Sequence, residues 1–328
     1  MSESHVLVGF TPKPEERESL HEVLGDIARI TYINDLPDDA RAEALKSADV
    51  FFGRRMAAEL RPGEIELLAD VKMIQEHGAG VDFMPFARLS PTAVIASNAG
   101  STAEPIAEHT VALIMALAKR IVPNHNALSR GDFPQGQLNK SLRDSTCAII
   151  GFGGIGQATA RLLRPFGTKI YALNRTGKTD EPVDFIGTLD NLEHAVRNSD
   201  IVVISIPNNN ATRGMFNAER LSWLKPDAIL VSIARAAHVE ETPLWEHMQT
   251  HPDFQVAIDA WWVEPMRHGE FKIQHPFFDS PNFLGSPHNS SAVPGLARHS
   301  SRKAAQNIRR FLQGEPVNGQ VRREDYLS

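Results

Sequence analysis

Short apolar runs alternate with amphipathic segments over the first hundred residues. Residues 15–24 have helical spacing and predict a helix, and four apolar runs within residues 5–98 predict strands: HVLVGF, ADVFFG, VKMIQEHG and TAVIASN. Strands that alternate with helices indicate a parallel sheet with helices on both faces.

The pattern changes at residue 103. The segment AEPIAEHTVALIMALAKRIV, residues 103–122, predicts one long helix with little polarity. A helix of that kind must be buried on several sides, as at a domain junction or a dimer interface. Residues 123–144 are rich in turn formers and predict a connection with little regular structure.

A second series of strands and helices begins at Ser145. Helices are expected over residues 155–163 and 191–197, and strands in TCAIIGFG, TKIYALNR, SDIVVISIP, AILVSIAR, FQVAIDAWW and NFLGSPHNS. About six strands with intervening helices form the dinucleotide-binding pattern. Residues 292–314 predict a terminal helix that Gly314 ends. A chain of 328 residues has room for two such domains.

Composition narrows the class of protein further. The chain is 42% hydrophobic and 23% charged, with a net charge of −6 and scattered basic residues, so no nucleic-acid partner is expected. The longest apolar run, Val111–Ala118, is too short to cross a bilayer, and the N-terminus lacks a signal-peptide pattern. We therefore expect a cytoplasmic protein. The lone Cys147 predicts a buried, inert thiol, and no histidine or acid pattern has the spacing of a metal site.

The glycines at 151, 153 and 156 form G-x-G-x-x-G between an apolar strand and a helix. The first allows a tight turn, the second lets a pyrophosphate approach the backbone, and the third lets the helix pack on the strand. The pyrophosphate would then lie on the free N–H groups at the helix N-terminus. An ordinary strand–helix turn is the alternative. Cofactor contacts are expected from Gly151, Gly153, Gly154, Ile155 and Gly156.

The residues that follow the next strand bear on the choice of cofactor. An acidic side chain about 20 residues beyond the glycines usually binds the ribose 2′-hydroxyl. Here Asn174, Arg175 and Thr176 stand there, with Lys178 close by. These side chains favour a 2′-phosphate through charge-assisted hydrogen bonds, so NADP(H) is preferred and NAD(H) stays open. Arg175 could instead stack on the adenine, in which case either cofactor would serve.

These motifs together resemble the D-isomer-specific 2-hydroxyacid dehydrogenase family, which includes glyoxylate and hydroxypyruvate reductases. The similar segments are HGAGVD, AEHTVALIMALAKR, GFGGIG, ATRGMFNAERLSWLKPDAILVSIARAAHVEE, AIDAWWVEP and LGSPHNSS. The resemblance implies a flavodoxin-like substrate domain of residues 1–100 plus 295–328 and a Rossmann-type cofactor domain of residues 101–294. It also implies an active site between the domains and a homodimer formed through the long helix region.

Arg235, Glu264 and His288 fall on the family's catalytic positions. Arg235 follows an apolar strand, and its planar fork suits a substrate carboxylate. His288 also follows a strand, and an imidazole has an unperturbed pKa of about 6.5, which suits proton transfer. Glu264 would fix the tautomer of that imidazole. An arginine after a strand is often a surface ion pair, and the histidines at 77, 238 and 268 compete with His288 for this role.

The resemblance also assigns binding residues. The substrate carboxylate would bind to the backbone of Ala79 and Gly80, where small residues allow close approach. A simple turn is the alternative. The resemblance implies that further cofactor contacts come from Thr102, Pro207, Thr212, Ile233 and Asp259. The chain departs from the family pattern at positions that put the substrate in doubt: Ala236, Glu240, Glu241, Trp261, Trp262 and Asn289.

The sequence leaves the substrate open among glyoxylate, hydroxypyruvate, a phosphorylated hydroxy acid and a bulkier keto acid. Arg54 or Arg55 follows a strand and could bind a second anionic group, or the two could be a solvated surface pair. At most one of Trp261 and Trp262 should line the pocket, because neighbours on an extended segment point apart. Oxidation of formate or phosphite on the same scaffold, and a dinucleotide sensor without activity, are the alternative functions.

Overall fold

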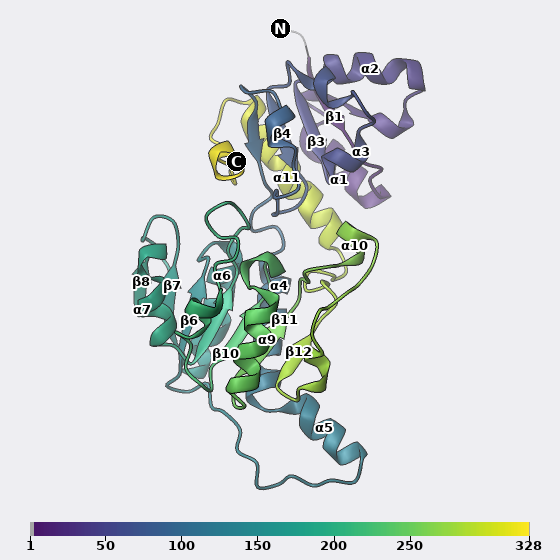
Figure 1. The fold of residues 1–328 in the computed structure, drawn as a ribbon. Coiled ribbons are helices and arrows are strands. Elements are labelled where there is room, and N and C mark those ends of the chain that lie inside the picture. The colour runs from purple at the N-terminus through teal and green to yellow at the C-terminus, as the bar shows by residue number, and fades with distance from the viewer. Residues whose placement is uncertain (1–2, 328) are drawn as a thin grey trace. The chain divides into compact units, whose positions relative to one another are not determined.

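The computed structural model describes residues 3–327, which divide into two units of parallel α/β structure (Figure 1). Unit 1 consists of Met1–Thr102 and Val293–Ser328, and unit 2 of Ala103–Ala292. Each unit contains one parallel sheet with helices on both faces. The predicted pair of doubly wound domains is therefore confirmed.

Unit 1 contains a five-stranded sheet in the order β2-β1-β3-β4-β5, which is the flavodoxin-like order. Its strands are β1 Ser4–Val8, β2 Ala28–Tyr32, β3 Val50–Gly53, β4 Met73–Glu76 and β5 Val94–Ala96. Helices α1 (Pro14–Leu24) and α11 (Leu296–Leu312) pack together on one face, and α2 (Asp38–Lys46) lies on the other. The short helix α3 is Met56–Glu59. The C-terminal helix thus completes the core of the N-terminal sheet.

Unit 2 contains a seven-stranded sheet in the order β12-β11-β10-β9-β6-β7-β8, which extends the Rossmann order by one strand. Its strands are β6 Thr146–Ile150, β7 Lys169–Leu173, β8 Phe185–Gly187, β9 Ile201–Ile204, β10 Ile229–Ser232, β11 Gln255–Ile258 and β12 Phe283–Gly285. Its helices are α4 Ala103–Ala118, α5 Ile121–Ser129, α6 Gly154–Leu163, α7 Leu192–Arg197, α8 Ala218–Leu221, α9 Glu241–Thr250 and α10 Pro265–His268. Four central strands, β6, β9, β10 and β11, are buried except for Thr146 at the start of β6, which explains their apolar runs.

The prediction of one helix over residues 103–122 is wrong in its extent. Helix α4 ends at Ala118, Arg120 adopts a left-handed conformation (φ 50°), and α5 begins at Ile121 and runs into the segment predicted to lack regular structure. Residues on α4 pack in the core of unit 2, which accounts for the apolarity of this helix: Leu113, Ile114, Leu117 and Ala118. Among residues 3–327, no helix is both long and apolar enough to cross a membrane.

Candidate active site

The glycine turn between β6 and α6 is closed on one side and open on the other. Gly151 has φ +99°, and a Cβ there would lie 2.5 Å from the backbone nitrogen of Ile206. A Cβ on Gly156 would lie 2.6 Å from the Gly151 carbonyl oxygen, whereas one on Gly153 would meet no atom within 4 Å. The space beside Gly153, at the N-terminus of a ten-residue helix, fits a pyrophosphate.

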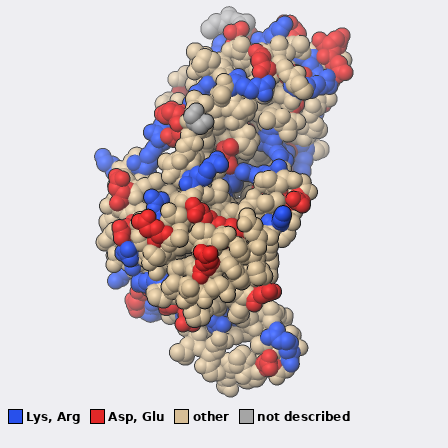
Figure 2. Space-filling view, viewed as in Figure 1, with Lys and Arg blue, Asp and Glu red and all other residues tan. Residues whose placement is uncertain are grey.

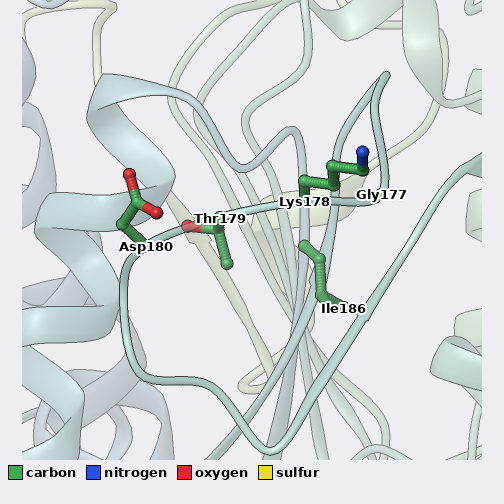
Figure 3. A pocket seen from close by; sticks show the side chains of 5 residues that line it. All are labelled: Gly177, Lys178, Thr179, Asp180 and Ile186. Atoms are coloured by element: carbon green, nitrogen blue, oxygen red, sulfur yellow. The ribbon is translucent and has the colours of Figure 1, made fainter.

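The loop after β7 is shaped by Asn174. Its Oδ1 accepts hydrogen bonds from the backbone of Thr176 and Gly177, and its Nδ2 donates to the carbonyl of Lys178. The side chains of Arg175, Thr176 and Lys178 are exposed. A cavity of about 540 Å³ opens beside this loop, and the Lys178 amine and the Asp180 carboxylate point away from each other along it (Figure 3). Its lining also includes Gly177, Thr179 and Ile186.

Several predicted cofactor residues lie at the carboxyl edge of the same sheet. Ile233 and Asp259 directly follow the parallel strands β10 and β11, which pair through Ser232 and Ile258. After β9, the Thr212 hydroxyl donates to the Pro207 carbonyl over 2.7 Å and holds the loop between them. The predicted residue Thr102 belongs to unit 1.

A polar group forms around Asp259, which is fully buried. The Ser286 hydroxyl, at the end of the neighbouring strand β12, donates to Asp259 Oδ1 over 2.6 Å. His109 Nε2, on α4, lies 3.0 Å from the same hydroxyl. Asp259 Oδ2 is buried and has no hydrogen-bond partner within residues 3–327, so one acceptor is left for a donor on a ligand.

His288 and Glu264 form a hydrogen-bonded pair. His288 Nδ1 lies 2.8 Å from Glu264 Oε2, and the two side chains are 30% and 6% exposed. His288 has φ 51°, an uncommon conformation for a residue other than glycine, and its N–H donates to the Asp259 carbonyl. This arrangement orients an accessible imidazole with a buried carboxylate, as a general acid/base requires.

Arg235 follows β10 and is held through its backbone. His238 is fully buried, and its Nδ1 lies 2.7 Å from the Arg235 carbonyl oxygen. His238 therefore orients the arginine segment. This role was missed in the sequence, where His238 was considered only as a competitor for the catalytic position.

Both tryptophans after β11 are packed structurally. Trp261 is buried, donates to the Ser286 carbonyl and lies against Gly285, where a Cβ would be 2.7 Å from the indole. Trp262 donates to the Val239 carbonyl and stacks on Phe277. Trp261 thus supports the strand end that precedes His288.

The predicted carboxylate-binding loop of unit 1 follows β4. Ala79 is exposed, and Gly80 is partly buried. The Asn98 amide donates to the carbonyls of His77 and Ser300, and the Asn98 N–H donates to the Gly78 carbonyl. The loop is therefore anchored to the end of β5 and to α11, contacts between distant segments that the sequence pattern did not reveal.

Two acidic side chains lie close to this loop. Burial raises the pKa of Glu76 well above its usual range, although the nearby backbone of Gly78 and His77 acts against this rise. Glu59 accepts from the N–H groups of Arg54 and Arg55, yet burial raises its pKa as well. Elsewhere, burial raises the pKa of the Cys147 thiol, as expected of an inert cysteine. Residues 3–327 contain no cluster of three metal-ligating side chains.

Comparison with known proteins gives a consistent result. The model of the D-isomer specific 2-hydroxyacid dehydrogenase NAD-binding domain matches residues 111–290, more than half of the chain. A glycerate dehydrogenase of Methylorubrum extorquens is 27% identical over 289 residues, 84% of this chain and 86% of the relative. A glyoxylate reductase of Pyrococcus furiosus is 26% identical over 291 residues, 86% of this chain and 84% of the relative.

Solved structures show the same fold. A D-isomer specific 2-hydroxyacid dehydrogenase from Xanthobacter autotrophicus Py2, crystallised with NADPH and MES, has a TM-score of 0.80 and covers 99% of each chain. Its sequence identity is 23%, so the likeness is one of fold.

Proposed function

Since the chain belongs to the D-isomer specific 2-hydroxyacid dehydrogenase family, we propose that it transfers a hydride between NAD(P)H and a 2-keto acid to give a D-2-hydroxy acid. The observation that best supports this reaction is the contact of 2.8 Å between His288 Nδ1 and Glu264 Oε2. Reduction of a carbonyl requires a proton donor beside the hydride acceptor, and this pair supplies one.

His288 acts as the general acid in the reductive direction. The reduced nicotinamide, when bound, supplies the hydride to the carbonyl carbon. His288 donates its Nε2 proton to the carbonyl oxygen, while the Glu264 carboxylate accepts the hydrogen bond from Nδ1–H and stabilises the imidazolium. In the oxidative direction the neutral imidazole removes the hydroxyl proton.

Arg235 binds the substrate carboxylate and polarises the carbonyl. The backbone N–H groups of Ala79 and Gly80 bind the same carboxylate, and Arg54 lies close to that loop. Asp259 Oδ2 is the acceptor for the carboxamide of the nicotinamide, a role that the buried, unpartnered oxygen supports. The remaining cofactor contacts proposed are Thr102, Gly151, Gly153, Gly154, Ile155, Gly156, Pro207, Thr212 and Ile233.

NADP(H) is the preferred cofactor. Arg175 and Lys178 are exposed cations in the loop after β7, and none of the residues 174–176 that directly follow this strand is acidic. Asn174 contributes by shaping the loop, since its amide atoms already have partners within it. A larger dissociation constant for NADPH in Arg175→Gln than in wild type, with NADH binding unchanged, would support this preference. An equal loss of affinity for NADPH and NADH in Arg175→Gln would indicate instead that Arg175 stacks on the adenine.

The protein forms a homodimer through an arm made of α5 and the segment to residue 138. No residue of α5 is buried, and large apolar side chains on the arm are exposed: Ile121, Val122, Leu128, Phe133 and Leu138. Figure 2 shows few charged side chains over this arm on the face in view. The cost of leaving this apolar surface in water favours its burial against a second copy.

Paired kinetics test the proposed reaction. NADPH and NADH are each offered with glyoxylate, hydroxypyruvate and a bulkier 2-keto acid, and absorbance at the nicotinamide band is followed. Faster turnover with NADPH on one keto acid would support both the reaction and the cofactor preference. Oxidation of formate or phosphite without keto acid reduction, or cofactor binding without any turnover, would refute the proposed reaction.

A further inference from the structure

An ion pair with one buried partner lies at the carboxyl edge of the five-stranded sheet, and the proposed chemistry does not use it. Arg54 Nη2 donates to Glu16 Oε1 over 2.6 Å. The Glu16 side chain is fully buried, whereas the Arg54 side chain is 38% exposed. The guanidinium is therefore accessible from solvent, but its charge is balanced from the buried side.

Besides Arg54, Glu16 is held ionised by two residues from other segments, Ser301 and His77, and by the N-cap of its own helix, Lys13. The Ser301 hydroxyl donates to Glu16 Oε1 over 3.1 Å, the Lys13 N–H donates to Oε2, and His77 Nε2 lies 3.3 Å from Oε1. Burial raises the pKa of Glu16, but these hydrogen bonds and the charge of Arg54 together lower it to about 2. Burial lowers the pKa of His77, so its ring adds no charge at neutral pH.

The position of Arg54 is also fixed. Its guanidinium carbon lies 4.2 Å from the centroid of the Phe10 ring, and Phe10 packs edge-on against Phe52. Arg54 Nη2 is 3.5 Å from His77 Nε2, and His77 immediately precedes the loop proposed to bind the substrate carboxylate. Arg54 would have to leave both Glu16 and Phe10 to follow an anion elsewhere.

Three other ionisable residues lie close to Arg54, and Arg55 is the one cation among these three. Burial raises the pKa of both Glu59 and Glu76. Arg55 is exposed, so water and salt screen its charge.

We infer that the Glu16–Arg54 pair makes the enzyme select 2-keto acids whose only charge is the carboxylate beside the keto group. This inference rests on the proposed function. A second carboxylate or a phosphate on the substrate would meet a guanidinium that is already neutralised, with the buried Glu16 carboxylate behind it. A hydroxyl or alkyl tail carries no charge and meets no such repulsion, so Glu16 acts as the element that rejects dianions.

The test compares 2-oxobutyrate, a monoanion, with 2-oxoglutarate, a dianion, in wild type and in Glu16→Gln. Wild type should prefer 2-oxobutyrate. In Glu16→Gln, kcat/KM for 2-oxoglutarate should rise at least about tenfold, while that for 2-oxobutyrate stays within about threefold. Adding Arg54→Gln should abolish the gain. Glu18→Gln is the matched control, because it removes an exposed carboxylate from the same helix. It should leave kcat/KM unchanged for both substrates.

A gain of activity cannot result from misfolding. If Glu16→Gln does not fold, Arg54→Gln alone should lower kcat/KM for 2-oxoglutarate about tenfold relative to 2-oxobutyrate, because the Glu16 charge is then unbalanced. A wild-type enzyme that reduces no 2-keto acid would refute the proposed function. In that case the dissociation constant for 2-oxoglutarate, measured by calorimetry, tests the Glu16–Arg54 pair by itself. It should be smaller in Glu16→Gln than in wild type, and adding Arg54→Gln should abolish this difference. Equal use of both substrates by wild type, or no gain in Glu16→Gln, overturns the inference alone.

Discussion

Two glycines of the same turn should respond to alanine in different ways. In Gly151→Ala the new Cβ would lie 2.5 Å from the Ile206 nitrogen, and the residue has φ +99°. A left-handed conformation costs an alanine about 1–2 kcal/mol, and the contact with backbone must be relieved by moving the loop after β9. We expect a total loss of about 3 kcal/mol in the free energy of unfolding, together with loss of cofactor binding.

Gly153→Ala is the matched variant. Its Cβ would meet no protein atom within 4 Å, and its φ of −97° is open to alanine. The free energy of unfolding should therefore change by less than about 1 kcal/mol, the cost of losing a glycine N-cap. The methyl group would fill the space proposed for the pyrophosphate, so the dissociation constant for NADPH should rise at least about tenfold.

Urea unfolding and fluorescence titration with NADPH measure the two quantities separately. The expected pattern is loss of both stability and binding in Gly151→Ala, and loss of binding alone in Gly153→Ala. Unchanged NADPH affinity in a folded Gly153→Ala protein would refute the placement of the cofactor on this turn. Full stability of Gly151→Ala would refute the steric argument.

Three further perturbations have defined outcomes. Glu264→Gln should lower kcat for keto acid reduction about 10- to 100-fold with the NADPH affinity unchanged, because a charge-assisted hydrogen bond to His288 is lost; an unchanged kcat would contradict the role of the pair. Burial and the neighbouring His251 lower the pKa of His247 to about 4, so the folded protein favours the neutral ring. Protonation of this residue therefore leaves the free energy of unfolding unchanged above pH 6.5 and lowers it by about 1–2 kcal/mol as the pH drops to 4. Urea unfolding across this range should show a smaller fall in His247→Gln, and an identical fall would exclude this histidine as the cause. Phe133→Ser combined with Leu138→Ser, two side chains that are 76% and 91% exposed, should convert a dimer to a monomer in analytical ultracentrifugation, and a persistent dimer would exclude the arm as its interface.

The sequence pattern predicted the central strands and the edge strands β5 and β12, but it missed the edge strands β2 and β8. β6, β9, β10 and β11 are buried on both faces and appear as continuous apolar runs. The edge strand β2 alternates apolar and polar residues within ARITY, and the edge strand β8 has three residues, so neither produced a recognisable run. The break at Arg120 also left no signal, because it occurs at a residue with no glycine or proline beside it.

The candidate site was predictable where a residue follows a strand and unpredictable where a partner comes from elsewhere. Arg235, Asp259 and His288 each follow an apolar strand, and the alternation of strands and helices brings such positions to one sheet edge. His109 lies within an apolar helix and Glu16 within an amphipathic one, and only the fold shows that they face Asp259 and Arg54.

The most direct test of the proposed reaction is single-turnover reduction of a 2-keto acid by NADPH in His288→Gln. His299→Gln, which changes an exposed histidine of α11, serves as the matched control. Loss of the general acid should slow hydride transfer about 10²- to 10⁴-fold while the dissociation constant for NADPH stays at the wild-type value, and His299→Gln should behave as wild type. Hydride transfer at the wild-type rate in a folded, NADPH-binding His288→Gln protein would contradict the account.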